Sequence, residues 1–249
     1  MSKPESRRVL LIAGGSRGLG AATARLAAAA GYDVAVNYKG NAKAAASVVD
    51  AVKAAGRRAV ALQGDMGVEA DIERVFAQTT EQLGAITHFV HSAGINGEYS
   101  RLDEASADKI REVITVDTIG ALLCLRSCVR AMSTKHGGKG GSVVMLSSMA
   151  ATLGAGGDCV WYAAAKGGVD SMVVGIAREV AREGMRVNAV SPGVIDTDIQ
   201  PPGRVERVAP MLPMGRAGQA PEVAEAIMFL LSDAASYING ANLRVSGGR

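Results

Sequence analysis

Tyr162 and Lys166 are the two side chains whose spacing most directly suggests catalysis. Residues four apart lie on the same face of a helix, so the phenol and the ammonium would be neighbours. A tyrosine with an ordinary pKa near ~10 transfers protons poorly at neutral pH, and a nearby cation lowers that pKa by favouring the phenolate. We therefore expect Tyr162 to be a general acid and base with Lys166 as its partner. Exposed helices with no catalytic role also show this Tyr–Lys spacing, so the pair needs support from other residues.

Two serines at the end of a predicted strand supply the third candidate catalytic hydroxyl. The apolar run Val143–Leu146 predicts a buried strand, and Ser147 and Ser148 follow it, ahead of the loop that leads to Tyr162. Ligands bind at the carboxyl ends of strands in parallel sheets, so a hydroxyl at this point can donate a hydrogen bond to a substrate oxygen. Two serines are also an ordinary way for a strand to end, and this simpler interpretation remains open.

A glycine-rich turn, Gly14-x-x-x-Gly18-x-Gly20, separates a predicted strand from an alanine-rich helix. Glycines at such a turn let the backbone approach a pyrophosphate, which then lies at the positive end of the helix dipole. The spacing differs from the general Gly-x-Gly-x-x-Gly dinucleotide fingerprint, and a flexible loop is the alternative. The position at the first strand-to-helix turn of an alternating chain favours a dinucleotide site, which we extend to Ser16 and Leu19.

The residues after the second predicted strand indicate which dinucleotide is bound. An acidic residue there would hold the ribose 2′-hydroxyl and exclude a phosphate, but the sequence reads Asn37-Tyr38-Lys39. Arg17 in the turn, together with Lys39, can instead pair with a 2′-phosphate. The sequence thus predicts NADP(H) in preference to NAD(H), unless both cations are merely solvated.

A single α/β domain over residues 1–249 is expected to position these groups. Short β-branched runs alternate with longer helical patterns, which predicts a Rossmann-type, doubly wound parallel sheet of about seven strands with helices on both faces. The expected strands are Val9–Ala13, Val34–Asn37, Ala59–Gln63, Ile86–His91, Ser142–Ser147, Arg186–Val190 and Ala241–Val245. The expected helices are Leu19–Ala30, Lys43–Ala55, Glu69–Leu83, Ala107–Met132, Tyr162–Arg182 and Pro221–Leu231.

Two of these helices, Ala107–Met132 and Tyr162–Arg182, are apolar on more than one face. A surface helix normally has one apolar stripe, so we expect the sheet to cover one side of each and a second subunit to cover the other.

His88 and His91 are three residues apart in a strand-like run, which puts them on opposite faces and predicts no shared metal ion.

The composition narrows the class of protein. Hydrophobic residues make up 48% and charged residues 20%, as in a folded globular chain, and a net charge of +3 without a run of basic residues argues against nucleic-acid binding. The segment Met1–Arg8 lacks the apolar core of a secretory signal, and no apolar stretch is long enough to span a bilayer, so we expect a cytoplasmic protein with no membrane contact. Three cysteines without a Cys-x-x-Cys spacing are expected to be reduced core residues; they are Cys124, Cys128 and Cys159.

Together these motifs resemble the short-chain dehydrogenase/reductase family over nearly the whole chain. Besides the glycine turn, Ser148 and Tyr162-x-x-x-Lys166, the resemblance rests on Asp65, Ala93-Gly94, Pro192-Gly193 and the closing Gly247-Gly248. It implies an NAD(P)-dependent enzyme that transfers hydride between nicotinamide and a small-molecule carbonyl or alcohol. It also implies a homotetramer.

The resemblance assigns roles to individual residues. Ser148 would orient and polarise the substrate oxygen, and Lys166 would lower the pKa of Tyr162 and bind the nicotinamide ribose. Asp65 would contact adenine. Other cofactor contacts would come from Met66, Ser92, Ala93, Gly94, Pro192 and Gly193, with Ile195 and Thr197 at the nicotinamide carboxamide.

Two positions depart from the family pattern. His91-Ser92 stands where the family usually has two asparagines, and Asp117 stands where an asparagine usually completes the proton relay. An aspartate has a similar shape but adds a charge near Lys166, so it either preserves the relay through its backbone or weakens turnover. We include Asp117 among the catalytic residues on this basis.

The substrate side is less defined. The segment between Thr197 and Pro221 is irregular and rich in Pro and Gly, as expected of a lid. Leu153 and Trp161 are candidates to line the pocket, but neither has a charge that selects a substrate. A 3-oxoacyl thioester, a sugar and another ketone all remain open, and the alternative function is a dinucleotide-binding sensor or structural subunit with weak or no catalysis.

Overall fold

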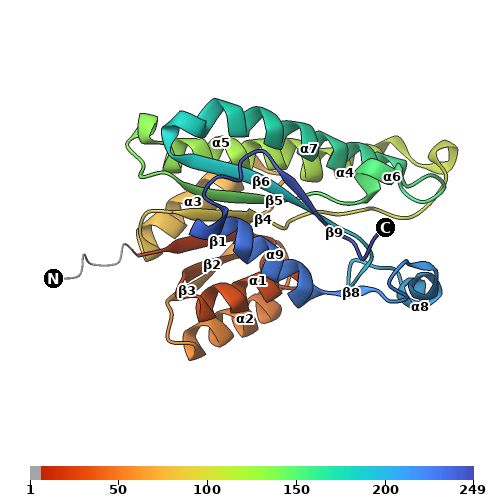
Figure 1. The fold of residues 1–249 in the computed structure, drawn as a ribbon, viewed down its shortest axis with the longest axis horizontal. Coiled ribbons are helices and arrows are strands. Elements are labelled where there is room, and N and C mark those ends of the chain that lie inside the picture. The colour runs from red at the N-terminus through yellow and green to blue at the C-terminus, as the bar shows by residue number, and fades with distance from the viewer. Residues whose placement is uncertain (1–6) are drawn as a thin grey trace.

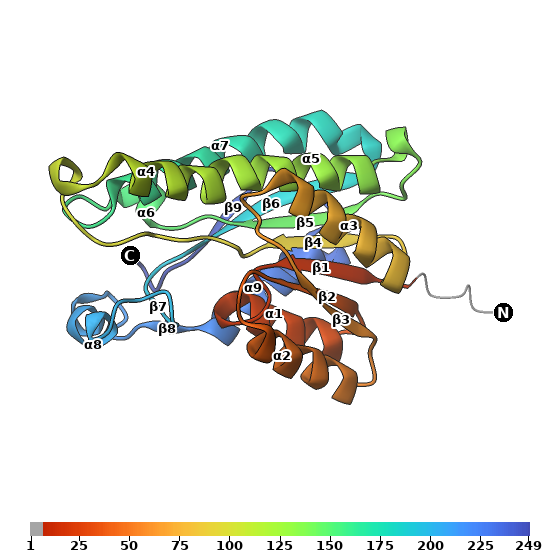
Figure 2. The same ribbon diagram turned by 180° about the vertical axis from the view of Figure 1, so that it is seen from behind.

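The computed structural model describes residues 7–249 as a parallel sheet with helices packed on both of its faces (Figures 1 and 2). The strand order is β3-β2-β1-β4-β5-β6-β9, and every neighbouring pair is parallel. The strands are β1 (Val9–Ala13), β2 (Asp33–Tyr38), β3 (Ala59–Gln63), β4 (His88–His91), β5 (Gly141–Leu146), β6 (Met185–Pro192) and β9 (Asn242–Val245). The Rossmann-type fold is thereby confirmed, with each strand within two residues of its predicted ends.

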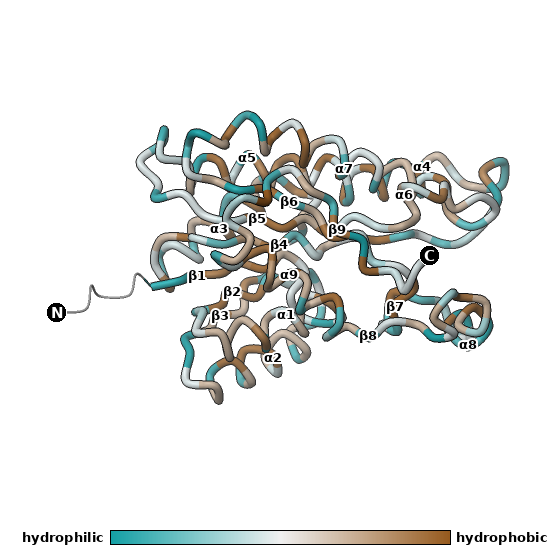
Figure 3. Tube along the Cα trace, viewed as in Figure 1, coloured by the Kyte–Doolittle hydropathy of each residue, from teal (hydrophilic) through white to brown (hydrophobic). Residues whose placement is uncertain are grey.

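The strand β1 shows why the strands are apolar throughout. Leu11 packs into the core on one face of the sheet, while Leu10 and Ile12 pack into the core on the other. The first face is covered by α3 (Glu69–Leu83), α5 (Gly120–Met132) and α7 (Val160–Val180), and the second by α1 (Gly18–Ala29), α2 (Ala42–Ala54) and α9 (Ala220–Leu231). Because both faces are buried, the strands need apolar residues at every position, and Figure 3 shows hydrophobic residues concentrated along the central strands.

The strand order reverses between β1 and β4, since β2 and β3 extend to one side and β5, β6 and β9 to the other. In sheets of this kind ligands bind at such a reversal, outside the carboxyl ends of the strands. Small elements that the sequence did not predict gather near this end of the molecule (Figure 2). They are α6 (Ala150–Leu153), α8 (Arg204–Val208) and the paired strands β7 (Ile195–Asp196) and β8 (Gly218–Gln219). Near them lies α4 (Ala107–Ile114), the first part of the helix predicted over Ala107–Met132.

The helix predicted over Ala107–Met132 is interrupted. After α4, a π-helical segment covers Thr115–Ile119, and α5 begins at Gly120. A π-helical turn accommodates an extra residue and is frequent at functional sites. A Cβ at Gly120 would lie 2.0 Å from the carbonyl oxygen of Met66, so only glycine allows this close approach. The helix thus has the predicted bounds, and the sequence did not predict the π-helical turn because apolar periodicity does not register one added residue.

The outer faces of α5 and α7 expose apolar side chains. Leu122 is 45% exposed and Val174 is 41% exposed, and Ile119 just before α5 is 47% exposed.

Within residues 7–249, no helix is both long and apolar enough to cross a membrane. Most of the segment Met1–Arg8, for which the sequence predicts no secretory signal, lies outside the described residues, so the predicted domain is described from residue 7 onward.

Candidate active site

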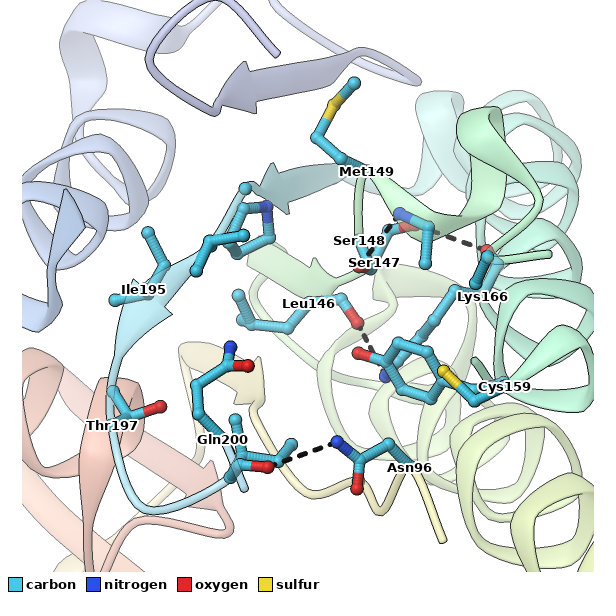
Figure 4. A pocket seen from close by; sticks show the side chains of 18 of the residues that line it. Asn96, Leu146, Ser147, Ser148, Met149, Cys159, Lys166, Ile195, Thr197 and Gln200 are labelled. Atoms are coloured by element: carbon cyan, nitrogen blue, oxygen red, sulfur yellow. Dashed lines mark hydrogen bonds between the residues drawn. The ribbon is translucent and has the colours of Figure 1, made fainter. Parts of the chain in front are cut away.

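A pocket outside the carboxyl ends of β4, β5 and β6, beside the start of α1, brings many of the predicted site residues together (Figure 4). In Figure 4, Ile195 and Thr197 lie on one side of the pocket, and Ser148 and Lys166 lie on the other. The predicted residues that line it are Leu19, Ser92, Gly94, Ser148, Leu153, Tyr162, Lys166, Pro192, Gly193, Ile195 and Thr197. They come from five separate stretches of the chain, which the fold places side by side.

The two serines after β5 have different environments. Ser147 is buried, and its hydroxyl donates a hydrogen bond of 3.2 Å to the carbonyl oxygen of Lys166, which ties β5 to α7. Ser148 Oγ accepts a hydrogen bond of 3.1 Å from the Ala150 N–H and lies within hydrogen-bonding reach of the Tyr162 hydroxyl. Both serines line the pocket, but only the Ser147 hydroxyl donates to a backbone carbonyl among residues 7–249, so Ser148 keeps its hydroxyl proton for another acceptor.

Lys166 is held rigidly in the wall of the pocket. Its side chain is 4% exposed, and Nζ donates a hydrogen bond of 3.1 Å to the carbonyl oxygen of Leu146. The ammonium lies 5.5 Å from the centre of the Tyr162 ring and 3.1 Å from Asp117 Oδ2. Burial is the largest single effect and lowers the pKa of Lys166, but Asp117, Tyr162 and Asp170 together outweigh it, so the net pKa is raised. Lys166 is therefore positively charged in this pocket.

Asp117 is fully buried behind Lys166, in the π-helical segment. Its Oδ1 accepts a hydrogen bond of 2.8 Å from the Ile95 N–H, while Oδ2 faces the ammonium without hydrogen-bond geometry. Burial raises the pKa of Asp117, and the Lys166 charge opposes that rise. The expected charge beside Lys166 is thus present, as one half of a buried ion pair.

Opposing effects act on the pKa of Tyr162. Its pKa is raised, chiefly by burial, and the negative charge of Asp117 adds to the rise. Lys166 lowers the pKa, as the sequence predicts, and so does the hydrogen bond with Ser148. The net direction is upward, because a buried phenol ionises reluctantly and Asp117 counters part of the lysine charge.

The glycine turn is packed backbone against backbone. Gly14 has a φ of 72°, and a Cβ on it would lie 2.7 Å from the Ala93 nitrogen. A Cβ on Gly20 would lie 2.3 Å from the Gly14 carbonyl oxygen. At the start of α1, Arg17 makes no side-chain cap, and the first turn contains no acidic residue. The free N–H groups and dipole of α1 therefore suit an anionic pyrophosphate, and the residues fit a dinucleotide.

The residues predicted for the adenosine end have mixed positions. Asn37 is buried, and its side chain accepts a hydrogen bond from the Gly14 N–H at 3.1 Å and donates one to the Gly64 carbonyl oxygen at 3.0 Å, so it holds the turn together.

The other residues predicted for this end differ in their surroundings. Lys39 Nζ lies 2.8 Å from Asp65 Oδ2. Met66 is buried against Cys124, so its side chain belongs to the core. Half-buried Tyr38 and exposed Arg17 complete the set, and Arg17 makes no salt bridge with any residue from 7 to 249.

Trp161 does not line the pocket. It is 3% exposed, and its Nε1 donates a hydrogen bond of 2.9 Å to the Asn96 carbonyl oxygen, behind the pocket wall. Leu153 does line it and is 50% exposed. The placement of Trp161 was wrong because residues 161 and 162 of one helix face different directions.

Sequence reasoning missed a polar group on the far side of the pocket. Arg204 at the start of α8, Asp158 before α7 and Tyr99 before α4 all line it, as does Gln200. Each of these residues lies in a loop or at a helix end without a recognisable motif. Only an arginine in the Pro- and Gly-rich lid segment offered a signal, since a charged lid residue can close on a ligand.

The cysteines and histidines add no reactive site. All three cysteines are free and buried, as predicted. Residues 7–249 contain no group of three or more His, Cys, Asp or Glu side chains arranged for a metal ion. His91 is buried beside Lys166, and burial together with that charge lowers its pKa to about 3, so it is neutral at ordinary pH.

Comparison with known proteins identifies relatives of the whole chain. The protein family described as enoyl-(acyl carrier protein) reductase matches residues 13–249. An uncharacterised oxidoreductase of Escherichia coli (strain K12), YgfF, is 42% identical over 97% of this chain and 99% of its own. A 3-oxoacyl-[acyl-carrier-protein] reductase of a Synechocystis species is 35% identical over 97% and 96% of the two chains. The crystal structure of a short chain dehydrogenase from Burkholderia cenocepacia in complex with NADP superposes with a TM-score of 0.91, at 30% identity over 99% of both chains.

Proposed function

This chain belongs to the short-chain dehydrogenase/reductase family, and we propose that it interconverts a carbonyl and a secondary alcohol with NADP(H), using Tyr162 as the general acid and base. The family makes it an NAD(P)-dependent oxidoreductase; the choice of NADP(H), the role of Tyr162 and the substrate are the proposal. The observation that supports it is the meeting of Ser148, Tyr162 and Lys166 in one pocket with the start of α1.

Each of the three side chains has a separate task in carbonyl reduction. Ser148 donates a hydrogen bond to the substrate oxygen and so holds the carbonyl beside Tyr162. Tyr162 donates its proton to that oxygen as the alcohol forms, and the Lys166 ammonium stabilises the phenolate that remains. When bound in this pocket, a reduced nicotinamide would provide the hydride for the carbonyl carbon. In alcohol oxidation the phenolate removes the proton instead.

The test of this mechanism is the rate of NADPH consumption with ketones, 3-oxoacyl thioesters and aldoses. Tyr162→Phe should lower kcat by about 10²- to 10⁴-fold, the usual contribution of a general acid, with unchanged NADPH binding. Ser148→Ala should also lower kcat, whereas the matched Ser147→Ala should keep the rate and lower only thermal stability, because Ser147 ties β5 to α7. Equal losses from the two serine variants would contradict the assignment of Ser148.

A sensor or structural subunit is the second candidate, and the Asp117–Lys166 ion pair favours it. A lysine paired with a buried carboxylate stabilises a phenolate less, so proton transfer is slower. NADPH binding without turnover on any member of the substrate panel would support the sensor. Turnover that depends on Tyr162 would exclude it.

The preference for NADP(H) rests on Arg17 and Lys39. Arg17 is exposed at the start of α1 and has no acidic partner among residues 7–249, whereas Lys39 is paired with Asp65. Arg17 should therefore contribute more to 2′-phosphate binding than Lys39 does. We expect kcat/KM for NADPH to exceed that for NADH, and Arg17→Ala to reduce the ratio more than Lys39→Ala. A ratio of one or less in the unmodified protein would contradict the proposal.

We further infer a homotetramer formed through the α4–α5 and α7 helices, because Ile119, Leu122 and Val174 expose apolar surface there. Light scattering that gave the mass of one chain would refute this.

Three free cysteines, none in a disulfide, fit a cytoplasmic protein, since reducing compartments keep thiols reduced. Fractionation of the native cells would test that location.

A further inference from the structure

The polar group that sequence reasoning missed contains the guanidinium of Arg204, which contacts one aromatic ring and makes one side-chain hydrogen bond. Arg204 is 13% exposed, and its guanidinium carbon lies 4.7 Å over the centre of the Tyr99 ring. Its Nη2 donates a hydrogen bond of 2.8 Å to Asp158 Oδ2. The Tyr99 hydroxyl in turn accepts a hydrogen bond of 3.0 Å from Asn96. Arg204, Asp158, Tyr99 and Asn96 all line the pocket that contains Tyr162.

The two members of the Arg204–Asp158 pair are held unequally. The cation–π contact with the Tyr99 ring holds the guanidinium against the pocket wall. Asp158 is 41% exposed and follows two glycines, Gly156 and Gly157, so its side chain can turn toward solvent at little cost. The arginine therefore stays in the pocket while the carboxylate can leave.

The guanidinium also has unused hydrogen-bonding capacity. A guanidinium presents five N–H donors in a planar fork. In the described part of the chain, the Arg204 side chain makes a single hydrogen bond, to Asp158. A carboxylate matches the fork with two parallel hydrogen bonds, which a neutral carbonyl does not.

The charge of the pocket lining points the same way. The charged side chains that line the pocket are Lys166, Arg204, Arg249 and Asp158. Lys166 is paired with Asp117 behind it, so Arg204 and Arg249 face a single acidic side chain, Asp158, in the lining formed by residues 7–249. An anionic substrate would meet a favourable field on entry.

We propose that Arg204 is a specificity-determining residue that binds a carboxylate of the substrate, at the position that the Asp158 carboxylate occupies in this structure. This inference rests on the proposed function, because the substrate carbonyl must lie at Tyr162 while the acid group lies at Arg204. The substrate class is thus an oxo acid, or the corresponding hydroxy acid in the oxidation direction. Asp158 closes the site when no substrate is present and yields its place when one binds.

The test compares oxo acids with their methyl esters, which differ in charge and little in shape. A series in which the ketone lies progressively farther from the acid group covers the unknown spacing, with NADPH consumption as the measurement. The unmodified protein should show a higher kcat/KM for one acid than for its ester, mostly through KM. Arg204→Gln should reduce that preference by about tenfold to a hundredfold, as expected for the loss of a charged hydrogen-bond partner.

Asp158→Asn is the matched variant that separates recognition from a lid contact. It breaks the same ion pair, but it removes the competitor of the substrate, so KM for the acid should fall severalfold while KM for the ester stays constant. If the pair were only a latch between α8 and α7, both variants would change acid and ester equally and in the same direction. That result would overturn the proposal and leave the oxidoreductase activity intact.

A binding measurement keeps the proposal testable even without turnover. Calorimetric titration with saturated monocarboxylates and with their amides, in the presence of NADP, probes Arg204 without any ketone. The acid should bind more tightly than the amide, and Arg204→Gln should abolish the difference. Equal binding would overturn the role of Arg204, whereas tight acid binding without reduction of any ketone would overturn the proposed function alone. Thermal melting of each variant verifies the fold.

Discussion

Replacing Asp117 with asparagine is the most informative perturbation of the proton path. The asparagine of the Asp117→Asn variant would have nearly the same shape, and its side-chain oxygen can still accept the hydrogen bond from the Ile95 N–H. The change removes one buried negative charge beside Lys166, and that charge also raises the pKa of Tyr162. The pKa of Tyr162 should therefore fall, so the phenolate forms at lower pH.

The structure sets the size of this effect. Lys166 Nζ lies 5.5 Å from the centre of the Tyr162 ring and 3.1 Å from Asp117 Oδ2. The carboxylate is thus at most about 9 Å from the ring, where a unit charge contributes about 1.8 kcal/mol at an effective dielectric constant of about 20. At fixed pH this energy corresponds to roughly a twentyfold larger ratio of phenolate to phenol.

The assay is the pH dependence of kcat/KM for alcohol oxidation, which needs the phenolate. Its rising limb should move to lower pH in Asp117→Asn, and the near-ultraviolet absorbance of tyrosinate, with Tyr162→Phe as the blank, should follow the same shift. Asp170→Asn is the matched control, because Asp170 is one turn beyond Lys166 on α7 and acts on the lysine. It should leave the limb nearly in place.

Two outcomes would refute this reasoning about Asp117. An unchanged limb would mean that its charge does not reach Tyr162. A limb moved to higher pH would mean that Lys166 loses its proton once the carboxylate is gone. Breaking a buried ion pair can cost about 3–5 kcal/mol, so thermal unfolding of the variant must be measured alongside.

Two further predictions concern the turn and the buried histidines. Gly20→Ala places a Cβ 2.3 Å from the Gly14 carbonyl oxygen, so NADPH binding measured by titration should weaken at least about tenfold, and unchanged binding would contradict the packing of the turn. Burial lowers the pKa of His88 to about 4 and of His91 to about 3, whereas in the unfolded chain both titrate near 6.5. Because the unfolded chain then binds more protons, the free energy of unfolding should fall by about 1.4 kcal/mol per histidine for each pH unit below 6.5, down to the folded pKa. Urea unfolding at several pH values checks this, and a profile that stays flat would count against it.

The order and type of the main elements could be predicted from the sequence because they depend on local patterns. Apolar runs such as Val9–Ala13 form strands buried on both faces, and the longer amphipathic stretches between them form helices. The glycine turn was also readable, since Gly14 and Gly20 leave no room for a side chain. The pairing of Tyr162 with Lys166 followed from helical spacing alone.

Other parts of the site depend on residues that are far apart in the chain. Asn37 was expected to contact the cofactor, but its side chain holds the turn at Gly14. Lys39 was expected to be free for a phosphate, but it lies beside Asp65, which follows the next strand. In both cases adjacent parallel strands end at the same edge and bring their terminal residues together, which no window of sequence records.

The sequence by itself determined the fold class, the glycine turn and the identity of Ser148, Tyr162 and Lys166 as candidates, because each depends on periodicity or spacing within one element. Only the tertiary structure decided which charges face one another. It set Asp117 against Lys166 through a π-helical turn, and Arg204 against Asp158 across the pocket. Burial and electrostatic coupling depend on distances in space, so the pKa of Tyr162 and the charge of the substrate pocket are properties of the folded chain.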